Sequence, residues 1–341
     1  PVMLMVAVIS VQAQDDESTF SLSGSVDAYY RANLNTSYSD GGTVAPGTSF
    51  ANLPGFSLGM ANLIAGYEGE KVGFVADLVF GPRGTEAVFG ATTASSSIVN
   101  QLYTYWNVSD GFTLTFGNFN TFLGYEVISP SANYNYSTSY MFSYGPFSHS
   151  GLKADIALGE ASLMLAVLNP TDFTDFNPDG TYYGGAQLGI GGQYLNLLFG
   201  GEDFAYFQVD YTGGVDVSDA TYLGINATYN LDLFAGAAVY LQQSFTDDFS
   251  MGLRAEYFKQ LQSDDDEVID PNTGSNNLLV LSTKDASVID LTLSANYSVG
   301  SLTFIPEFRV DLYSEDEVLP EAGETPTSSL ASFVVAAVYS F

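Results

Sequence analysis

The chain has 341 residues, no cysteine, and a formal net charge of −31 from 39 acidic and 8 basic side chains. Nucleic acid is excluded as a partner because phosphates are bound by lysine and arginine, and the lack of cysteine excludes disulfides and thiolate catalysis. Charged residues make up only 14% of the chain, against about 25% in soluble domains, while apolar residues reach 46% and aromatic residues 14%. This composition indicates an outer surface that faces lipid.

The first residues have the pattern of an export signal. An apolar run covers 2–9, and Val11-Gln12-Ala13 has the small-residue pattern of a signal-peptidase site. We therefore predict that 1–13 is the remnant of a cleaved signal peptide and that 14–341 forms one domain. Because no basic residue precedes the apolar run, we expect the natural chain to begin upstream. A buried first strand is the alternative, which the acidic stretch 14–17 disfavours.

From Phe20 to the end, apolar and hydrophilic residues alternate with a period of two, a pattern typical of β-strands. Segments such as 251–261, 287–297 and 302–312 run for about eleven residues, the span of a tilted transmembrane strand. Beyond 2–9, no apolar run approaches the roughly 18 residues that a membrane helix needs. A closed barrel is the other structure that satisfies its backbone in lipid.

Short turns alternate with long connections, as in outer-membrane barrels with short periplasmic turns and long extracellular loops. The long connections are 34–57, 81–97, 120–148, 170–182, 262–285 and 314–329. A first count gives fifteen strands, but bacterial single-chain barrels use an even number. Dividing 183–212 at Gly191-Gly192 into 183–190, 193–200 and 203–212 gives sixteen. The predicted fold is therefore all-β, a closed antiparallel transmembrane β-barrel of sixteen strands.

If the apolar face of each strand contacts lipid, its hydrophilic face lines the lumen. Alternation assigns these residues to the pore lining: Asp27, Tyr29, Arg31, Lys71, Asp77, Arg254, Glu256, Asp290, Glu307, Arg309 and Asp311. A Lys or Arg facing lipid at the midplane would cost about 2–4 kcal/mol, whereas a charge facing water costs little. Two compatible interpretations stay open. Arg31, Arg254 and Arg309 form a transverse field against acidic neighbours, or the charges form cross-strand ion pairs that stiffen the wall.

The third long connection, 120–148, does not have the composition of a solvated loop. Glu126 is its only carboxylate, and its aromatic residues are Phe122, Tyr125, Tyr134, Tyr136, Tyr140, Phe142, Tyr144 and Phe147. Aromatic surface left in water is costly, so we expect this segment to pack against protein. It folds into the barrel, or it lies over the mouth or in a subunit interface.

Two further loops are strongly acidic. Their clusters are Asp264, Asp265, Asp266 and Glu267 in one, and Glu315, Asp316 and Glu317 in the other. Rings of carboxylates favour cations, and an acidic vestibule concentrates cations in a salt-dependent way. We therefore predict an acidic mouth that prefers cations, with a merely solvated surface as the alternative. The stretch 270–274 lacks the glutamate that would complete a calcium loop, so no metal site is predicted.

The chain ends in a predicted strand, 333–341, whose odd-numbered residues are apolar and lie on one face. A last strand that ends in Phe, with an aromatic residue two positions earlier, resembles the signal that outer-membrane barrels present to their assembly machinery. We expect Tyr339 and Phe341 to form this signal.

Several segments resemble the OmpL-like β-barrel type of bacterial outer-membrane porins. They are SVDAYY (25–30), YGPFSHSG (144–151), GAQLG (185–189), LRAEYF (253–258) and PEFR (306–309), and with Phe341 they span the predicted mature chain in order. The resemblance implies a diffusion channel. The low lysine and arginine content departs from typical porins and disfavours an anion channel.

By analogy with sixteen-stranded porins, in which the third loop folds inward, we expect 120–148 to narrow the lumen with Glu126, Tyr134, Tyr136 and Tyr140. The predicted function is a porin of a Gram-negative outer membrane that passes small hydrophilic solutes by passive diffusion and prefers cations. Its expected partners are outer-membrane lipid, the solutes and cations, the barrel-assembly machinery and, by the same analogy, two further copies in a homotrimer. The alternatives are a solute-specific channel, for example for a sugar, and a plugged structural or adhesive barrel.

No catalytic residue and no cofactor are expected. The only histidine, His149, lies between Ser148 and Ser150. Adjacent residues on an extended strand point to opposite faces, so they make a poor catalytic dyad. No Walker or dinucleotide-binding glycine pattern occurs in a strand–helix context.

Overall fold

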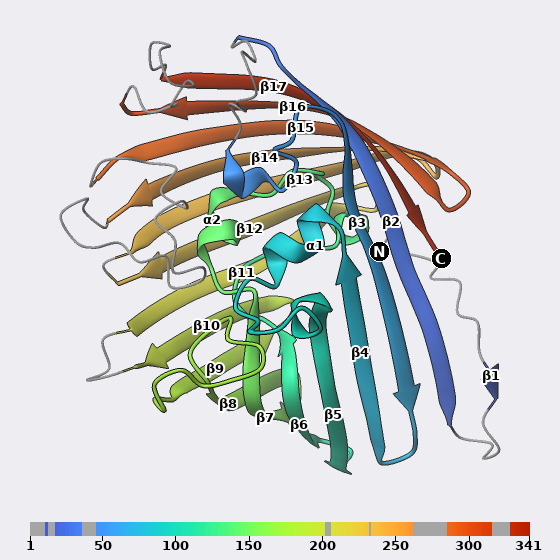
Figure 1. Cartoon of the computed structure of the whole chain (residues 1–341), viewed down its shortest axis with the longest axis vertical. Coiled ribbons are helices and arrows are strands. Elements are labelled where there is room, and N and C mark those ends of the chain that lie inside the picture. The colour runs from blue at the N-terminus through green and yellow to red at the C-terminus, as the bar shows by residue number, and fades with distance from the viewer. Residues whose placement is uncertain are drawn as a thin grey trace.

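The computed structural model describes residues 11–12, 18–35, 46–201, 206–231, 233–261, 285–315 and 328–341. Its main feature is a single antiparallel sheet that closes on itself, because its last strand, β17, pairs with β2 (Figure 1). The barrel consists of sixteen strands, β2–β17. A short strand β1 (Val11–Gln12) pairs with the start of β2. It falls within 1–13, whose assignment to a signal peptide stays a prediction.

The barrel strands follow one another around the wall in chain order. They are β2 (Thr19–Asn33), β3 (Gly55–Glu68), β4 (Val72–Phe80), β5 (Val99–Ser109), β6 (Phe112–Asn120), β7 (Ser148–Leu158), β8 (Ala161–Leu168), β9 (Tyr183–Ile190), β10 (Gln193–Gly200), β11 (Tyr206–Ser218), β12 (Thr221–Asn230), β13 (Phe234–Thr246), β14 (Phe249–Gln260), β15 (Ser287–Val299), β16 (Leu302–Tyr313) and β17 (Ser329–Ser340). The helical turns are η1 (Gly47–Ser49), α1 (Pro82–Ala87), η2 (Ser96–Ile98), η3 (Pro130–Ala132) and α2 (Tyr140–Tyr144).

The predicted closed antiparallel barrel of sixteen strands is confirmed. The division at Gly191-Gly192 is found as a two-residue turn between β9 and β10, where both glycines have positive φ angles of 56° and 77°. Such a turn favours glycine and matches the twist of a hairpin. One boundary was wrong, because the strand predicted to end at 212 continues to Ser218 as β11, which is paired with β12 from Gln208 to Ser218 with one register shift after Asp216.

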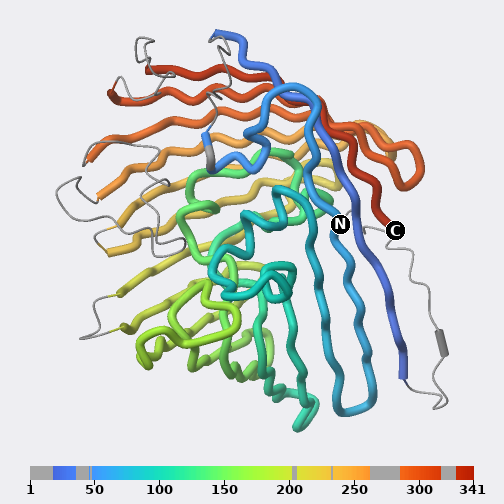
Figure 2. Tube along the Cα trace, in the orientation of Figure 1, coloured from blue at the N-terminus to red at the C-terminus, as the bar shows by residue number. Residues whose placement is uncertain are grey.

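The connections differ in length between the two ends of the barrel. At the end where the first barrel strand begins and the last one finishes, called the turn end, each hairpin closes within a few residues. At the opposite end, called the loop end, lie the long connections, including 81–98 and 121–147. Helices α1 and α2 belong to these two connections and lie in the space enclosed by the sheet (Figures 1 and 2). No helix among the described residues is long and apolar enough to cross a membrane.

The two faces of each strand differ as the alternation predicts. On β15, Asp290, Thr292 and Ser294 are fully buried on the inner face, whereas Ile289 and Leu291 are each 43% exposed on the outer face. A transmembrane barrel presents apolar side chains to lipid and polar ones to its lumen, the reverse of a soluble sandwich. The outer surface is therefore apolar, and the chemistry of the molecule is on the inside.

Candidate functional site

The connection between β6 and β7, residues 121–147, is called loop 3, and it crosses the lumen. The Gly124 N–H donates to Asp210 on β11 (3.0 Å), and the Asn135 side chain donates to Ser294 on β15 (2.8 Å). Segment 135–141 is almost fully buried. Figure 2 shows the trace of this connection within the ring of strands. Loop 3 thus starts on one side of the barrel and is anchored on the far wall.

Carboxylates of the wall bind the main-chain amides of loop 3. Glu307 on β16 accepts hydrogen bonds from the N–H groups of Tyr136 (2.7 Å) and Ser137 (3.1 Å). Glu256 on β14 accepts from the N–H groups of Tyr140 (2.8 Å) and Met141 (2.7 Å). Hydrogen bonds to an ionised acceptor are about twice as strong as neutral ones. Two glutamates on different strands therefore hold one short stretch of backbone.

Two arginines of the wall bind main-chain carbonyls of the same stretch. Arg254 donates to the carbonyls of Ser137 (2.7 Å) and Thr138 (3.2 Å), and Arg309 donates to the carbonyl of Thr138 (2.7 Å). Loop segment 136–141 is called the clamped segment. Because its amides face glutamates and its carbonyls face arginines, the wall recognises its backbone.

The charges around the clamped segment also pair with one another. Arg254 forms ion pairs with Glu126 of loop 3 (2.6 Å) and with Asp290 (3.0 Å). Arg309 pairs with the same Asp290 (2.8 Å) and with Asp311 (2.8 Å). Glu126 accepts a further hydrogen bond, from the Ser139 N–H (2.7 Å). A buried charge must be paired and hydrogen-bonded to be tolerated, and this network satisfies both conditions.

The first two long connections contribute to the clamp from the other side. Arg83 of α1 donates to the carbonyls of Ile128 (2.8 Å) and Tyr136 (3.0 Å) and lies over the Tyr136 ring. The Thr48 carbonyl in η1 accepts from the hydroxyls of Thr138 (2.6 Å) and Ser143 (2.7 Å). Alternation did not identify Arg83, because this residue follows β4 in a loop, where alternation assigns no face.

Glycines of the wall lie beneath loop 3 where its large side chains contact the sheet. A Cβ atom at Gly252 on β14 would lie 2.9 Å from the Tyr134 Cβ, and one at Gly224 on β12 would lie 2.5 Å from the Tyr125 hydroxyl. The same holds for Gly185 under Phe122, Gly236 under Met141 and Gly59 under Tyr136. The absence of a side chain at these positions allows the loop to approach. These glycines are a sequence signal of the docked loop that the analysis of composition did not use.

The residues assigned to the pore lining are found on the inner face, with one exception. The strand residues Asp27, Tyr29, Arg31, Asp77, Arg254, Glu256, Asp290, Glu307, Arg309 and Asp311 are all buried. Lys71 is exposed in the turn before β4, off the inner wall. The expectation that these charges face open water differs from the structure, because loop 3 covers Arg254, Arg309 and their partners. Arg31, expected to act with these two arginines, donates to the Ala51 carbonyl (3.2 Å) and to the Asn33 side chain (3.4 Å).

The other predicted site residues separate into three groups. In loop 3, Glu126, Tyr136 and Tyr140 are buried and Tyr134 is half-buried. At the mouth, Glu315 is exposed, whereas Asp264, Asp265, Asp266, Glu267, Asp316, Glu317 and the stretch 270–274 lie outside the described residues. At the end of the chain, Tyr339 faces outward on β17 and Phe341 pairs through its backbone with Gly24.

Two buried carboxylates of the inner wall have neutral partners. Asp77 on β4 accepts from the side-chain amides of Asn62, Asn100 and Gln101. Asp210 on β11 accepts from Asn196 (2.8 Å), Asn226 (2.7 Å), Thr212 (2.9 Å) and the Gly124 N–H. The sequence analysis missed Asp210, although its alternation with Gln208 and Thr212 assigns it to the inner face.

His149 lies at the base of loop 3 and is fully buried. Its Nε2 atom is 3.0 Å from the Thr121 hydroxyl, and its ring contacts the Phe122 ring at 5.0 Å between centroids. These contacts join the two ends of the loop, which is a packing role. Within the described ranges, no group of three or more His, Asp or Glu side chains is arranged to hold a metal ion.

A sixteen-stranded barrel with an apolar outer wall, a charged inner wall and a loop in its lumen defines the porin class of outer-membrane proteins. The family model described as "Putative beta-barrel porin-2, OmpL-like" matches residues 19–341, so the chain belongs to this family. The resemblance seen in the sequence is thereby confirmed. Family and fold together support the outer membrane as its location.

Solved structures of similar fold include outer-membrane proteins and a porin. Outer-membrane expressed OmpT of Vibrio cholerae matches with a TM-score of 0.52 and 11% identity over 96% of this chain and 99% of that one. The trimer form of in-vitro folded OmpT matches with a TM-score of 0.53 and 13% identity over 96% and 100%. A mutant of the Rh. blastica porin matches with a TM-score of 0.53 and 11% identity over 94% and 100%. At such identities the likeness shows the fold alone. Among curated proteins the sequence has no match.

Proposed function

We propose that this protein is a diffusion porin whose lumen is narrowed by loop 3 and which passes small hydrophilic solutes without a reaction or a cofactor. The observation that carries the proposal is the clamped segment, whose amides and carbonyls are hydrogen-bonded to Glu256, Glu307, Arg254 and Arg309 inside the barrel. Because charged groups of the wall hold the segment on both sides, the loop sets a constriction of fixed size.

We further propose that the channel prefers cations. Among the described residues, the buried carboxylates outnumber the buried arginines, since nine acids accompany four arginines: Asp27, Asp77, Glu126, Asp172, Asp210, Glu256, Asp290, Glu307 and Asp311 with Arg31, Arg83, Arg254 and Arg309. Rings of carboxylates favour cations. At the loop end, hydrogen bonds from Thr181 lower the pKa of Asp179, which keeps this exposed carboxylate charged.

The first experiment is single-channel recording of the refolded protein in a planar bilayer under a salt gradient. Open channels with a reversal potential directed toward the cation equilibrium potential support both proposals. Open channels without selectivity would contradict the cation preference alone. Bilayers that stay closed would contradict the porin function and favour a plugged or adhesive barrel. Neutralising Asp264, Asp265, Asp266 and Glu267 then tests the mouth, since an unchanged reversal potential would exclude these carboxylates as its source.

We also propose that three copies assemble in the membrane and that Tyr339 and Phe341 are read by the barrel-assembly machinery. The trimer form of the similar OmpT structure supports the first proposal. The second is supported by the end of β17, where Tyr339 faces outward and is 45% exposed. The oligomer is tested by the mass of the protein extracted in mild detergent.

A further inference from the structure

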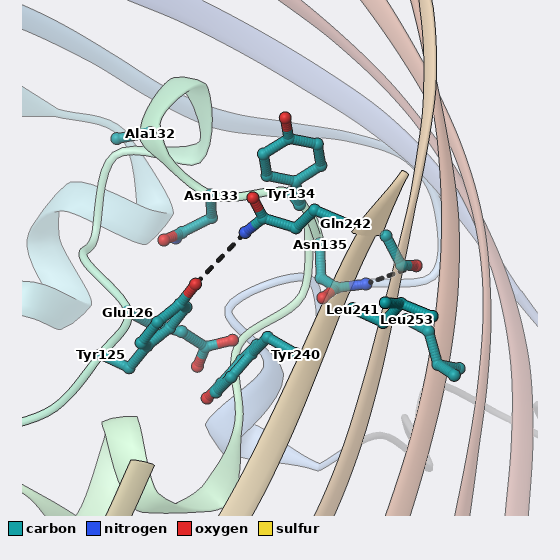
Figure 3. Close-up of a pocket in the computed structure, with 11 residues that line it drawn as sticks. Tyr125, Glu126, Ala132, Asn133, Tyr134, Asn135, Tyr240, Leu241, Gln242 and Leu253 are labelled. Atoms are coloured by element: carbon teal, nitrogen blue, oxygen red, sulfur yellow. Dashed lines mark hydrogen bonds between the residues drawn. The ribbon is translucent and has the colours of Figure 1, made fainter. Parts of the chain in front are cut away.

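A cavity of about 280 Å³ lies between loop 3 and strands β13 and β14 (Figure 3). Its walls include Tyr125, Asn133, Tyr134 and Asn135 from the loop and Gln242 from β13. A cavity of this volume has room for several waters, or for one small organic molecule. Gln242 and Gly252 lie near the hairpin that joins β13 to β14, so the cavity is on the turn-end side of the clamped segment.

The cavity is effectively uncharged, although the wall around it is ionic. No lysine or arginine is among the described residues that line it, and Glu126 is its only carboxylate. Both oxygens of that carboxylate are engaged, one with Arg254 (2.6 Å) and the other with the Ser139 N–H (2.7 Å). An ion entering the cavity would therefore find no opposite charge with which to pair. A neutral molecule would bring no unpaired charge into the cavity.

The remaining lining groups are aromatic rings and side-chain amides in fixed positions. The Tyr125 ring stacks on Tyr240 with 4.0 Å between centroids and 15° between planes, and its hydroxyl accepts from the Gln242 amide (3.2 Å). Asn135 is held by hydrogen bonds to Ser294 and to the Gly252 carbonyl. Tyr134, Asn133 and Gln242 also line the cavity, and Figure 3 shows them on the side away from Tyr240. The missing side chain at Gly252 gives Tyr134 its place against the wall.

This combination selects for one chemical class. Amides can donate and accept hydrogen bonds, which suits a molecule rich in hydroxyl groups. Tyrosine rings offer apolar faces together with hydroxyls, which suits a molecule with C–H faces between those groups. A few polar groups placed on a largely formed concave wall are the usual features of a small-molecule site. A compact neutral polyol, such as a single sugar ring, satisfies all of these conditions.

We propose that this cavity is a binding subsite for a neutral polyhydroxylated solute of monosaccharide size, on the path past the constriction. The proposal rests on the porin function and names a class of solute for it. The Tyr134 ring packs against the C–H face of the solute, and the Gln242 amide binds its hydroxyls. Asn133 shapes the wall, because its side-chain amide accepts from the Val127 N–H and donates to the Val127 carbonyl. Passage of this class is then saturable, whereas that of small ions is not.

The test uses glucose as the probe and the full-length protein refolded in detergent. Saturation-transfer NMR should show magnetisation reaching the ring protons of glucose. In the Gln242→Ala variant the affinity should fall about 2- to 10-fold, as expected for one lost hydrogen bond. The matched control is Gln243→Ala, because the adjacent residue points to the opposite face of β13 and its amide bonds to the Ser244 carbonyl. Absence of transfer to glucose, or an equal loss in both variants, would overturn the proposal.

Bilayer recordings separate this proposal from the porin function. Glucose should reduce the ion current through the wild-type channel in a saturable way, and this effect should weaken in Gln242→Ala. An open channel whose current is indifferent to glucose would refute the subsite and leave the porin intact. A closed bilayer would refute the porin, and the NMR titration would then decide whether glucose binds on its own.

Discussion

The double variant Glu256→Gln/Glu307→Gln tests whether the wall carboxylates hold loop 3 in the lumen. Each glutamate accepts two main-chain amides of the clamped segment. A hydrogen bond to a charged group contributes about 1.5–3 kcal/mol and a neutral one about 1 kcal/mol. Glutamine keeps one acceptor oxygen and has a donor NH2 group in place of the other, so at Glu256, whose two oxygens accept one amide each, one bond is lost. The loss of charge weakens the other bonds by about 1 kcal/mol each, so the total is at least about 4 kcal/mol. This corresponds to at least about a thousandfold change in the ratio of docked to undocked loop.

Single-channel recording measures this change directly. The wild type should show one stable conductance level, whereas the double variant should show transitions to a second, larger level when the loop leaves the lumen. The control is Asp77→Asn, which also removes a buried carboxylate of the inner wall. In the described part of the chain, the hydrogen-bond partners of this side chain are Asn62, Asn100 and Gln101, which lie outside loop 3. This control should keep a single level. A double variant with the levels and noise of the wild type would refute the reasoning, as would a control that flickers in the same way.

Two further predictions concern the position of the loop and the end of the chain. The chain has no cysteine, so an introduced pair can form only one disulfide. The double variant Tyr134→Cys/Gly252→Cys should cross-link on mild oxidation, because a Cβ at Gly252 lies 2.9 Å from that of Tyr134 and a shift of under about 1 Å gives disulfide geometry. The mismatched pair Tyr134→Cys/Gly224→Cys should stay reduced on a non-reducing gel. Replacing Phe341 by alanine should lower the yield of folded barrel in the outer-membrane fraction severalfold. The control Tyr339→Phe keeps the aromatic ring and should not lower this yield. Equal yields for both variants would show that this end is not an assembly signal.

The sequence was sufficient to predict the wall of the barrel. Period-two alternation requires only local information, because each residue's face follows from its neighbours'. It assigned Asp290 and Glu307 to the inner face, and both are buried there. The even strand number resolved the ambiguous stretch around Gly191-Gly192, where the structure has a two-residue turn. Strand ends were less certain, as β11 shows.

The interior of the barrel could be predicted only in outline. The aromatic content of 120–148 indicated that the segment packs against protein, but the partners of the clamped segment are backbone atoms, which every residue has. Composition therefore carries no information on which amide meets Glu307 or Glu256. Arg83 joins from a separate loop, 53 residues before Tyr136 in the chain, and no local pattern links the two. The wall glycines under Tyr125 and Tyr134 can be read in the sequence, but their role as contact points for the loop follows only from the path of the loop in the structure.

Of the two interpretations that the sequence left open, the structure has the cross-strand ion pairs, around Asp290, whereas the field across the lumen stays a prediction. Arg254 and Arg309 share Asp290, and each also donates to a carbonyl of loop 3. The charge of both arginines is therefore balanced by Asp290 and directed at carbonyls of the loop. Asp77 and Asp210, in contrast, are bound by neutral groups. We propose that an ion passing through the lumen meets arginines that are already paired and carboxylates whose hydrogen-bond partners are neutral, an arrangement that favours cations.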